Sequence, residues 1–153
     1  MATTYASVDA LAEKVGEHLG YSEYLTIDQA RVNLFADATG DHQWIHVDPE
    51  RAERESPFGG PIAHGYLTLS LIPDLASQIL TVEGVTMGVN YGCEKVRFPS
   101  PVPVGSEVRM GAELKSVDKV SEGTYQATLA FSLEVRDAAK PSCVAEVLFR
   151  YYT

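Results

Sequence analysis

Apolar and polar residues alternate along much of the second half of the chain. The alternation is clearest over residues 107–115 and 124–135, where every second side chain is apolar or small and most of the others are polar. A period of two predicts β-strands with one face in the core and the other in solvent. We expect two further strands over residues 85–98 and 143–152, with prolines and glycines marking the turns between them.

The first half of the chain has its apolar residues at helical spacing instead. Residues 7–19 predict an amphipathic helix, and residues 21–25 predict a short strand after it. The pattern Thr26-x-x-Gln29 is typical of a capping box and predicts the start of a second helix, which we expect to end at Gly40.

Residues 64–80 form the most apolar segment of the chain, and Asp74 is its only charged residue. A helix that is apolar nearly all round must be buried on most sides, and Pro73 should kink or break it. One long buried helix and about four antiparallel strands predict an α+β layered architecture. The edge strands of such a sheet invite pairing with a second copy of the chain.

Length, composition and charge limit what the protein can be. The chain has 153 residues, 45% of them hydrophobic and 22% charged, which suits a single globular domain over residues 1–153. Its formal net charge of −9 argues against a nucleic-acid partner, which needs a basic surface. No uninterrupted apolar run approaches the roughly 18–20 residues of a membrane span.

The two cysteines and the N-terminal segment both indicate a cytoplasmic protein. Cys93 and Cys143 have no metal-binding spacing and are expected to be reduced thiols. Asp9 and Glu13 stand where the cationic region of a signal peptide would lie, and no apolar region follows them.

Asp41 and His46 are the strongest candidates for chemistry. They lie five residues apart on one predicted loop, where a carboxylate and an imidazole can act together as an acid–base pair. Taken alone, Asp41 is equally readable as a turn residue and His46 as a hydrogen-bonded structural histidine. His42, beside Asp41, raises the idea of a metal site, but no further matching ligand accompanies it, so we expect no metal.

Two motifs resemble those of a known family. The stretch Phe35-Ala36-Asp37-Ala38-Thr39-Gly40-Asp41-His42-Gln43-Trp44-Ile45-His46 resembles the hydratase-2 motif of MaoC-like (R)-specific enoyl-CoA hydratases, and Pro61-Ile62-Ala63-His64-Gly65 resembles their second signature. The first motif is most similar to the nodulation-protein-N-like branch. The resemblance covers the whole chain and implies a hot-dog fold, in which an antiparallel sheet wraps around a long central helix.

The resemblance implies an activity and the residues that perform it. It implies a hydro-lyase that adds water reversibly to trans-2-enoyl-CoA and gives (R)-3-hydroxyacyl-CoA. Asp41 and His46 would be the catalytic pair, and the backbone N–H of Gly65 would stabilise the thioester oxyanion. Coenzyme A belongs to the substrate, so no separate cofactor is expected, and the protein is expected to be a homodimer.

Some positions depart from the family pattern or have two interpretations. Gln43-Trp44 replaces the usual Asn-Pro, and a serine of some members would fall near Pro73, which puts the substrate range in doubt. Gln43, Trp44, His64 and Tyr66 are candidate substrate contacts, with exposure, packing or a structural role at the helix start as the alternatives. Larger sets are candidates for coenzyme A phosphates (Arg51, Arg54, Lys95, Arg97) and for an acyl tunnel (Phe58, Tyr66, Leu67, Leu71, Leu75, Val89).

Other functions fit the same fold. An acyl-CoA thioesterase is the first alternative, although its carboxylate usually lies on the central helix, where this chain has only Asp74. A carrier-protein dehydratase would run the proposed reaction in reverse. A non-catalytic acyl-binding subunit of a dehydratase complex is the third alternative, and the presence of both Asp41 and His46 argues against it.

Overall fold

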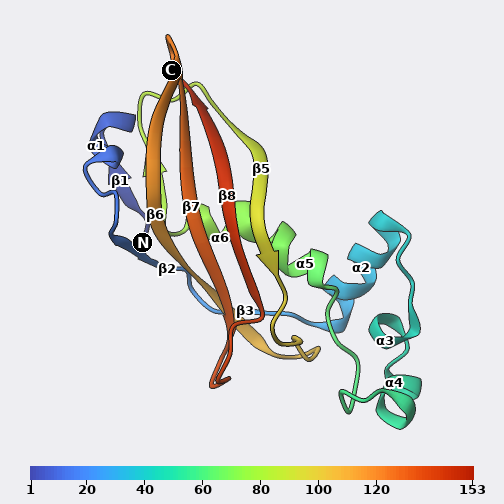
Figure 1. Cartoon of the computed structure of the whole chain (residues 1–153). Helices are drawn as coiled ribbons and strands as arrows, with labels where there is room; N and C mark the ends of the chain where they lie inside the picture. Colours follow the sequence, from blue (N-terminus) through green and yellow to red (C-terminus); the bar gives the residue numbers. More distant parts are fainter.

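The computed structural model describes all of residues 1–153 and contains one six-stranded antiparallel sheet (Figure 1). Its strands are β2 (His18–Tyr21), β3 (Leu25–Thr26), β5 (Met87–Arg97), β6 (Glu107–Ser121), β7 (Thr124–Val135) and β8 (Cys143–Tyr152). They run in the order β2-β6-β7-β8-β5, and β3 also pairs with β6. Because β5 pairs with β8 rather than with β6, the chain crosses over after β5, and β5 forms one edge of the sheet.

Six short helices accompany the sheet. They are α1 (Val8–Ala12), α2 (Gln29–Thr39), α3 (Trp44–Val47), α4 (Pro49–Glu55), α5 (Gly65–Ser70) and α6 (Ile72–Ser77). The helices α5 and α6 lie against one face of the sheet, where α5 contacts β8 and α6 contacts β6. The helices α2, α3 and α4 form a separate group beside the edge strand β5 (Figure 1). A parallel ribbon of β1 (Thr3–Tyr5) and β4 (Leu80–Val82) joins the N-terminus to the end of the helical layer.

The core lies between the α5–α6 layer and the inner face of the sheet. Leu114, Leu129 and Val147 alternate with outward-facing neighbours on β6, β7 and β8, and all three are almost completely buried. Leu75 of α6 is equally buried opposite them. Each such side chain contributes roughly 1.5–3 kcal/mol relative to an exposed position, so the alternation seen in the sequence is the main source of the fold's stability.

The predicted helix over residues 64–80 is broken, as Pro73 indicates. The break falls at Leu71, which ends α5 and precedes α6, and Pro73 occupies the first turn of α6. Proline has no N–H to donate, and in the first turn of a helix that N–H would have no partner in any case. The central helix expected for this fold is therefore formed by two short helices, α5 and α6, one directly after the other.

Two predictions for the N-terminal third are wrong in their bounds. The helix expected over residues 7–19 stops at Ala12, and Leu19 belongs to β2, which pairs with β6. The strand expected over residues 21–25 is split between the end of β2 and the start of β3. The cap of α2 is Asp28, whose carboxylate accepts a hydrogen bond from the Arg31 N–H at 2.8 Å, and Gln29 has another partner.

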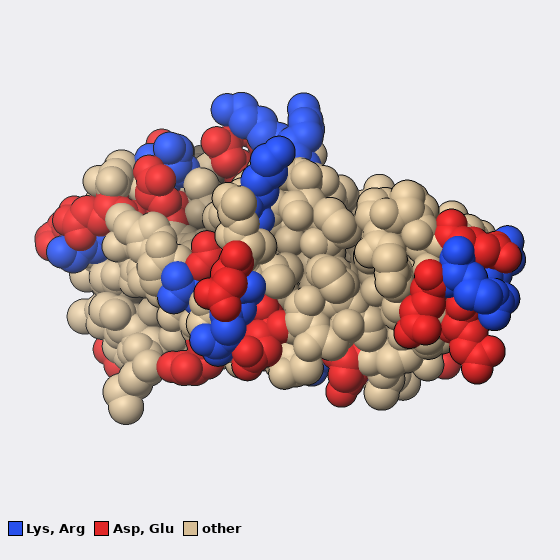
Figure 2. Space-filling model, turned by 90° about the horizontal axis from the view of Figure 1, so that it is seen from below, with Lys and Arg blue, Asp and Glu red and all other residues tan.

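The surface is unevenly charged. Seen from below, charged side chains gather at the end formed by α4, and a band with few charged side chains separates them from the rest of the charged surface (Figure 2). The α4 helix carries both acidic and basic residues, among them Arg51 and Arg54. None of the helices combines the length and the apolar character that crossing a membrane requires.

Candidate active site

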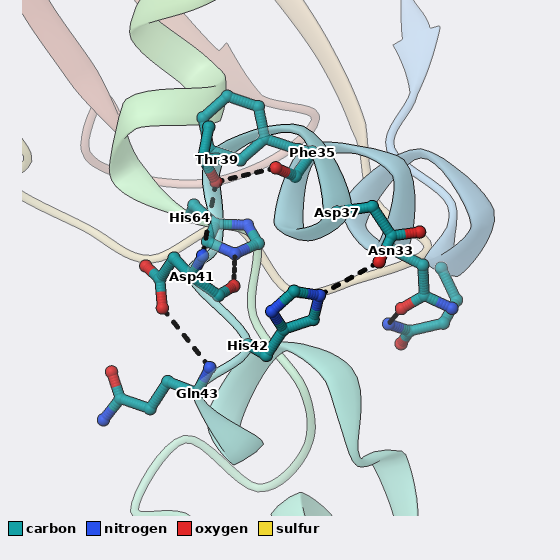
Figure 3. Close-up of polar contacts among 9 residues, drawn as sticks. Asn33, Phe35, Asp37, Thr39, Asp41, His42, Gln43 and His64 are labelled. Carbon is teal, nitrogen blue, oxygen red and sulfur yellow. Dashed lines mark hydrogen bonds and ion pairs between the residues drawn. The ribbon is translucent and has the colours of Figure 1, made fainter.

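A sharp turn after α2 presents Asp41. Gly40 ends α2 with φ 82°, a left-handed conformation that glycine adopts without steric cost. The next residue, Asp41, is exposed, and its carboxylate accepts a hydrogen bond from the Gln43 N–H at 3.3 Å (Figure 3). This contact closes a tight loop, and the single-turn helix α3 follows directly and carries His46.

Three side chains converge at this loop. A carboxylate oxygen of Asp41, a ring nitrogen of His46 and a ring nitrogen of His64 all lie within 4.8 Å of one another. His46 and His64 are buried, whereas Asp41 is exposed. One exposed carboxylate and two buried imidazoles therefore lie close together, and a carboxylate beside an imidazole can act as an acid–base pair.

A backbone carbonyl sets the tautomer of His46. The Nδ1 of His46 lies 2.7 Å from the carbonyl oxygen of Ile62, which can only accept, so Nδ1 carries the proton. The other ring nitrogen, Nε2, keeps its lone pair. The Ile62 N–H in turn donates to the Ile45 carbonyl at 3.0 Å, which ties the loop before α5 to α3. His46 is thus held as a neutral imidazole with a free basic nitrogen.

Burial keeps His46 in the neutral form. Loss of solvent around the ring lowers the pKa of His46 from its ordinary value of 6.5. The Ile62 carbonyl raises that pKa, the neighbouring His64 lowers it and the Asp41 carboxylate raises it, but burial is the largest effect. At neutral pH the imidazole is therefore available as a base.

Gln29 holds the backbone of His46 in place. Its Nε2 donates to the His46 carbonyl oxygen at 2.8 Å and to the Asn33 side-chain oxygen at 2.9 Å, so both amide hydrogens are used. The Oε1 atom of Gln29 is buried without a partner. The capping pattern predicts only a place for Gln29 at the start of a helix; the contact with His46 could not be predicted, because the two residues lie 17 positions apart and no local pattern links them.

His64 lies at the centre of the cluster and is 2% exposed. Its Nε2 donates to the backbone carbonyl oxygen of Asp41 at 3.0 Å (Figure 3), and its ring stacks on His46 with 3.9 Å between centroids. The sequence analysis treats His64 as a candidate substrate contact. Its burial and its bond to Asp41 agree instead with the alternative of a structural role at the start of α5.

Gly65 begins α5, and its N–H has no partner within the helix. A Cβ atom at this position would lie 3.1 Å from the Phe98 ring, so only glycine fits here without displacing Phe98. Gly65 and Phe98 both line a pocket of about 330 Å³, which also contacts Phe58 and Thr68. The predicted oxyanion donor therefore borders a space in which a small group can lie.

The remaining candidate substrate contacts differ in their exposure and in the residues that they touch. Tyr66 is 70% exposed and lines a second pocket, of about 420 Å³, together with Phe35 and Cys93. Gln43 contacts Asp41 through its main chain. Trp44 packs under the Arg51 guanidinium at 4.3 Å, which agrees with the packing alternative.

The basic candidates for coenzyme A phosphates and the apolar candidates for an acyl tunnel lie in different kinds of surroundings. Lys95 pairs with Glu146 at 3.6 Å, and Arg51 pairs with Glu55 at 2.8 Å, so both already have acidic partners. Within the set proposed for an acyl tunnel, some members are exposed (Phe58, Tyr66, Val89) and others are buried in the core (Leu67, Leu71, Leu75).

A second histidine–carboxylate pair joins this loop to α2. His42 Nε2 is 3.0 Å from an Asp37 carboxylate oxygen, and both side chains are exposed (Figure 3). The hydrogen bond to Asp37 raises the pKa of His42 above its ordinary value. His42 turns away from Asp41 toward α2, and it is not among the three residues that converge.

The converging residues form the one group in the chain with the composition of a metal site. Two of their imidazole nitrogens, Nδ1 of His46 and Nε2 of His64, already donate to backbone carbonyls. The buried Nδ1 of His64 has no partner. Each of these bonds fixes the tautomer of its ring, and the three side chains are fewer than the four protein ligands of a structural zinc site.

Comparison with known proteins identifies the family. The family model described as a MaoC like domain matches residues 10–134. The chain belongs to the MaoC-like family. It is 57% identical over 148 residues to the 3-hydroxyacyl-thioester dehydratase Z of Mycobacterium tuberculosis, with 97% of each chain covered. It is also 44% identical over 140 residues to the Nodulation protein N of Rhizobium leguminosarum, with 91% of this chain and 87% of that one covered.

A solved structure supports the same assignment. The (R)-hydratase from A. caviae involved in PHA biosynthesis superimposes with a TM-score of 0.72 at 27% identity, over 88% of this chain and 94% of that one. The predicted MaoC-like family, its nodulation-protein-N-like branch, the hot-dog fold and the hydro-lyase class are confirmed by these similarities.

Proposed function

We propose that the protein is an (R)-specific enoyl-CoA hydratase, which adds water to trans-2-enoyl-CoA and also catalyses the reverse dehydration. The observation that carries the proposal is the convergence of the Asp41 carboxylate with an imidazole of His46 whose Nε2 lone pair is free. The relatives named as a 3-hydroxyacyl-thioester dehydratase and an (R)-hydratase support the reaction type.

Each residue has a defined task in this reaction. His46 Nε2 accepts a proton from the water while the water oxygen bonds to C3 of the substrate. Asp41 orients that water, takes the proton from His46 Nε2 and passes it to C2, so both side chains return to their starting states and one water supplies both the hydroxyl group and the hydrogen. Because both side chains act from one side, the addition is syn.

Negative charge develops on the thioester oxygen when C3 is attacked, and the Gly65 N–H is the donor that stabilises it. Glycine allows the thioester to approach the backbone closely. One donor of this kind is worth on the order of 10²–10³ in rate. In this proposal coenzyme A enters as part of the substrate, and the chain's own residues supply the proton transfer without a cofactor or a metal.

The thioesterase alternative is less well supported by the structure. Its carboxylate would have to be Asp74, which lies exposed in the first turn of α6 and is not among the residues that converge with His46. Release of free thiol from acyl-CoA without a 3-hydroxy product would nevertheless favour that alternative over hydration.

The test is a steady-state assay of crotonyl-CoA hydration with chiral analysis of the product. We expect the (R)-3-hydroxy product, and we expect Asp41→Asn and His46→Gln each to lower kcat by about 10²–10⁴-fold while the fold survives. His42→Gln is the matched control, since His42 has its own carboxylate partner and is exposed. Wild-type rates in both site variants would exclude the proposal.

We also propose that the protein is a homodimer in the cytoplasm. The edge strand β5 presents Met87, Val89 and Tyr91 to solvent, and an edge with exposed apolar side chains suits pairing with a second copy. Tyr91→Glu should shift the sedimenting species toward the monomer, whereas Tyr21→Glu, at the opposite edge of the sheet, should not. Two unpaired cysteines fit a reducing compartment.

A further inference from the structure

His64 makes contacts on three sides, and none of these contacts takes part in the proposed proton transfer. His64 directly precedes α5, and its carbonyl oxygen accepts a hydrogen bond from the Leu67 N–H at 3.1 Å. Its Nε2–H bonds the Asp41 carbonyl oxygen at 3.0 Å, and one face of its ring covers His46 with planes 26° apart. Phe35 packs on the ring as well, with 4.9 Å between centroids.

These contacts join the three parts of the proposed mechanism. His64 directly precedes Gly65, the oxyanion donor, and it reaches the main chain of Asp41, which lies 23 positions earlier in the sequence. It also blocks rotation of the His46 ring on one face. A shift of His64 would therefore change the distance between the oxyanion donor and the acid–base pair.

We propose that His64 is a positioning residue, which fixes the Asp41 loop and the His46 imidazole relative to Gly65 through one hydrogen bond and one ring stack. This rests on the proposed function, in which Asp41 and His46 transfer the proton. His64 itself does not contact the reacting atoms, because it is 2% exposed, its Nε2 is already occupied and its Nδ1 is buried.

Two substitutions separate the contacts of His64. His64→Phe keeps a flat ring against His46 but removes the N–H donor to Asp41. His64→Gln can keep the donor but loses the ring. A displacement of about 1 Å in an active site can cost on the order of 10²-fold, so we expect His64→Phe to lower kcat by about that factor with little change in KM. We expect His64→Gln to recover a substantial part of that loss.

Three outcomes would overturn the proposal. His64→Phe could retain the wild-type kcat, which would show that the donor is unimportant; it could raise KM instead, which would indicate direct substrate contact; or His64→Gln could retain the full wild-type kcat, which would show that the ring stack is not needed. His42→Phe is the control, because it changes an exposed histidine of the same loop and should leave kcat and KM unchanged.

A measurement on the wild-type protein without substrate completes the test. Long-range ¹H–¹⁵N correlation spectra distinguish the two tautomers of a neutral histidine. The geometry requires His64 to carry its proton on Nε2 and His46 to carry its proton on Nδ1. A His64 with its proton on Nδ1 would overturn the proposal whether or not the variants fold. The outcome does not depend on hydratase activity, which the Asp41 and His46 variants test separately.

Discussion

Two histidine–carboxylate pairs lie around the loop between α2 and α3 and have opposite properties. Asp37 and His42 form a direct contact of 3.0 Å between exposed side chains, and this contact raises the pKa of His42. The ring of His46 is buried near Asp41, bonds a backbone carbonyl instead, and has a lowered pKa.

The difference shows what makes a histidine available for catalysis. The contact with Asp37 favours the protonated form of His42, so less of this imidazole carries a free lone pair near neutral pH. An imidazole that donates to a carbonyl keeps one free lone pair, and burial keeps it neutral. The carboxylate that assists it must be close enough to share a water, but not so close that it occupies the basic nitrogen.

Loss of the Gln29 contact to His46 should lower the rate less than removal of Asp41, His46 or His64, but more than any change at the exposed pair of Asp37 and His42. Gln29→Met removes the donor to the His46 carbonyl oxygen and leaves a side chain of similar length. A lost hydrogen bond of about 1.4 kcal/mol corresponds to a tenfold effect, so we expect kcat for crotonyl-CoA hydration to fall about tenfold. Asn33→Ala is the control, because Asn33 contacts the same amide but not His46. Equal losses in both variants would refute this role of Gln29.

The pH dependence of the rate should separate the two histidines. The base must be unprotonated, and burial lowers the pKa of His46, so the pH at which kcat/KM falls to half of its plateau should lie below 6.5. His42→Gln should leave this acidic limb in place, although His42 is the histidine whose pKa is raised. A half-maximal point above pH 6.5, or an acidic limb that disappears in His42→Gln, would show that His46 is not the base.

Stability should depend on pH with opposite sign for the two histidines. The folded-state pKa of His46 is lowered, so below pH 6.5 the unfolded chain binds more protons and the free energy of unfolding decreases as pH falls. The folded-state pKa of His42 is raised, so its contribution is present below pH 6.5 and is lost as pH rises through that raised value. Urea unfolding at pH 7.5 and 5.5 checks both signs.

The expected differences between variants are small but specific. Relative to the wild type, His46→Gln should lose less stability between pH 7.5 and 5.5, and His42→Gln should lose more. The same pH dependence in all three proteins would show that neither histidine has a different pKa in the folded and unfolded chains.

The sheet was the easier part of the molecule to predict. The alternation over residues 107–115 and 124–135 corresponds to inner and outer faces of β6 and β7, because burial on one face of a strand leaves its mark on the local sequence. The helix over residues 7–19 was overestimated, since pairing of His18–Tyr21 with β6 decides the conformation of its second half. Contacts between residues that lie so far apart in the sequence leave no local pattern of residue types.

The candidate site divides in the same way. The spacing of Asp41 and His46 and the position of Gly65 before an apolar helix could be found in the sequence. The partners that hold them could not, because the Ile62 contribution is a backbone carbonyl and carries no residue-type signal. The Gln29 contact spans 17 positions and was obscured by a local capping pattern.

The most direct test of the account is a double-mutant cycle on Asp41 and His46, with kcat/KM for crotonyl-CoA hydration measured for Asp41→Asn, His46→Gln and the combined variant. If the two side chains act on one water as a unit, the combined variant should be no slower than the worse single variant. If the two losses multiply, or if either single variant retains the wild-type value, the two groups do not share a water and the proposed mechanism is wrong.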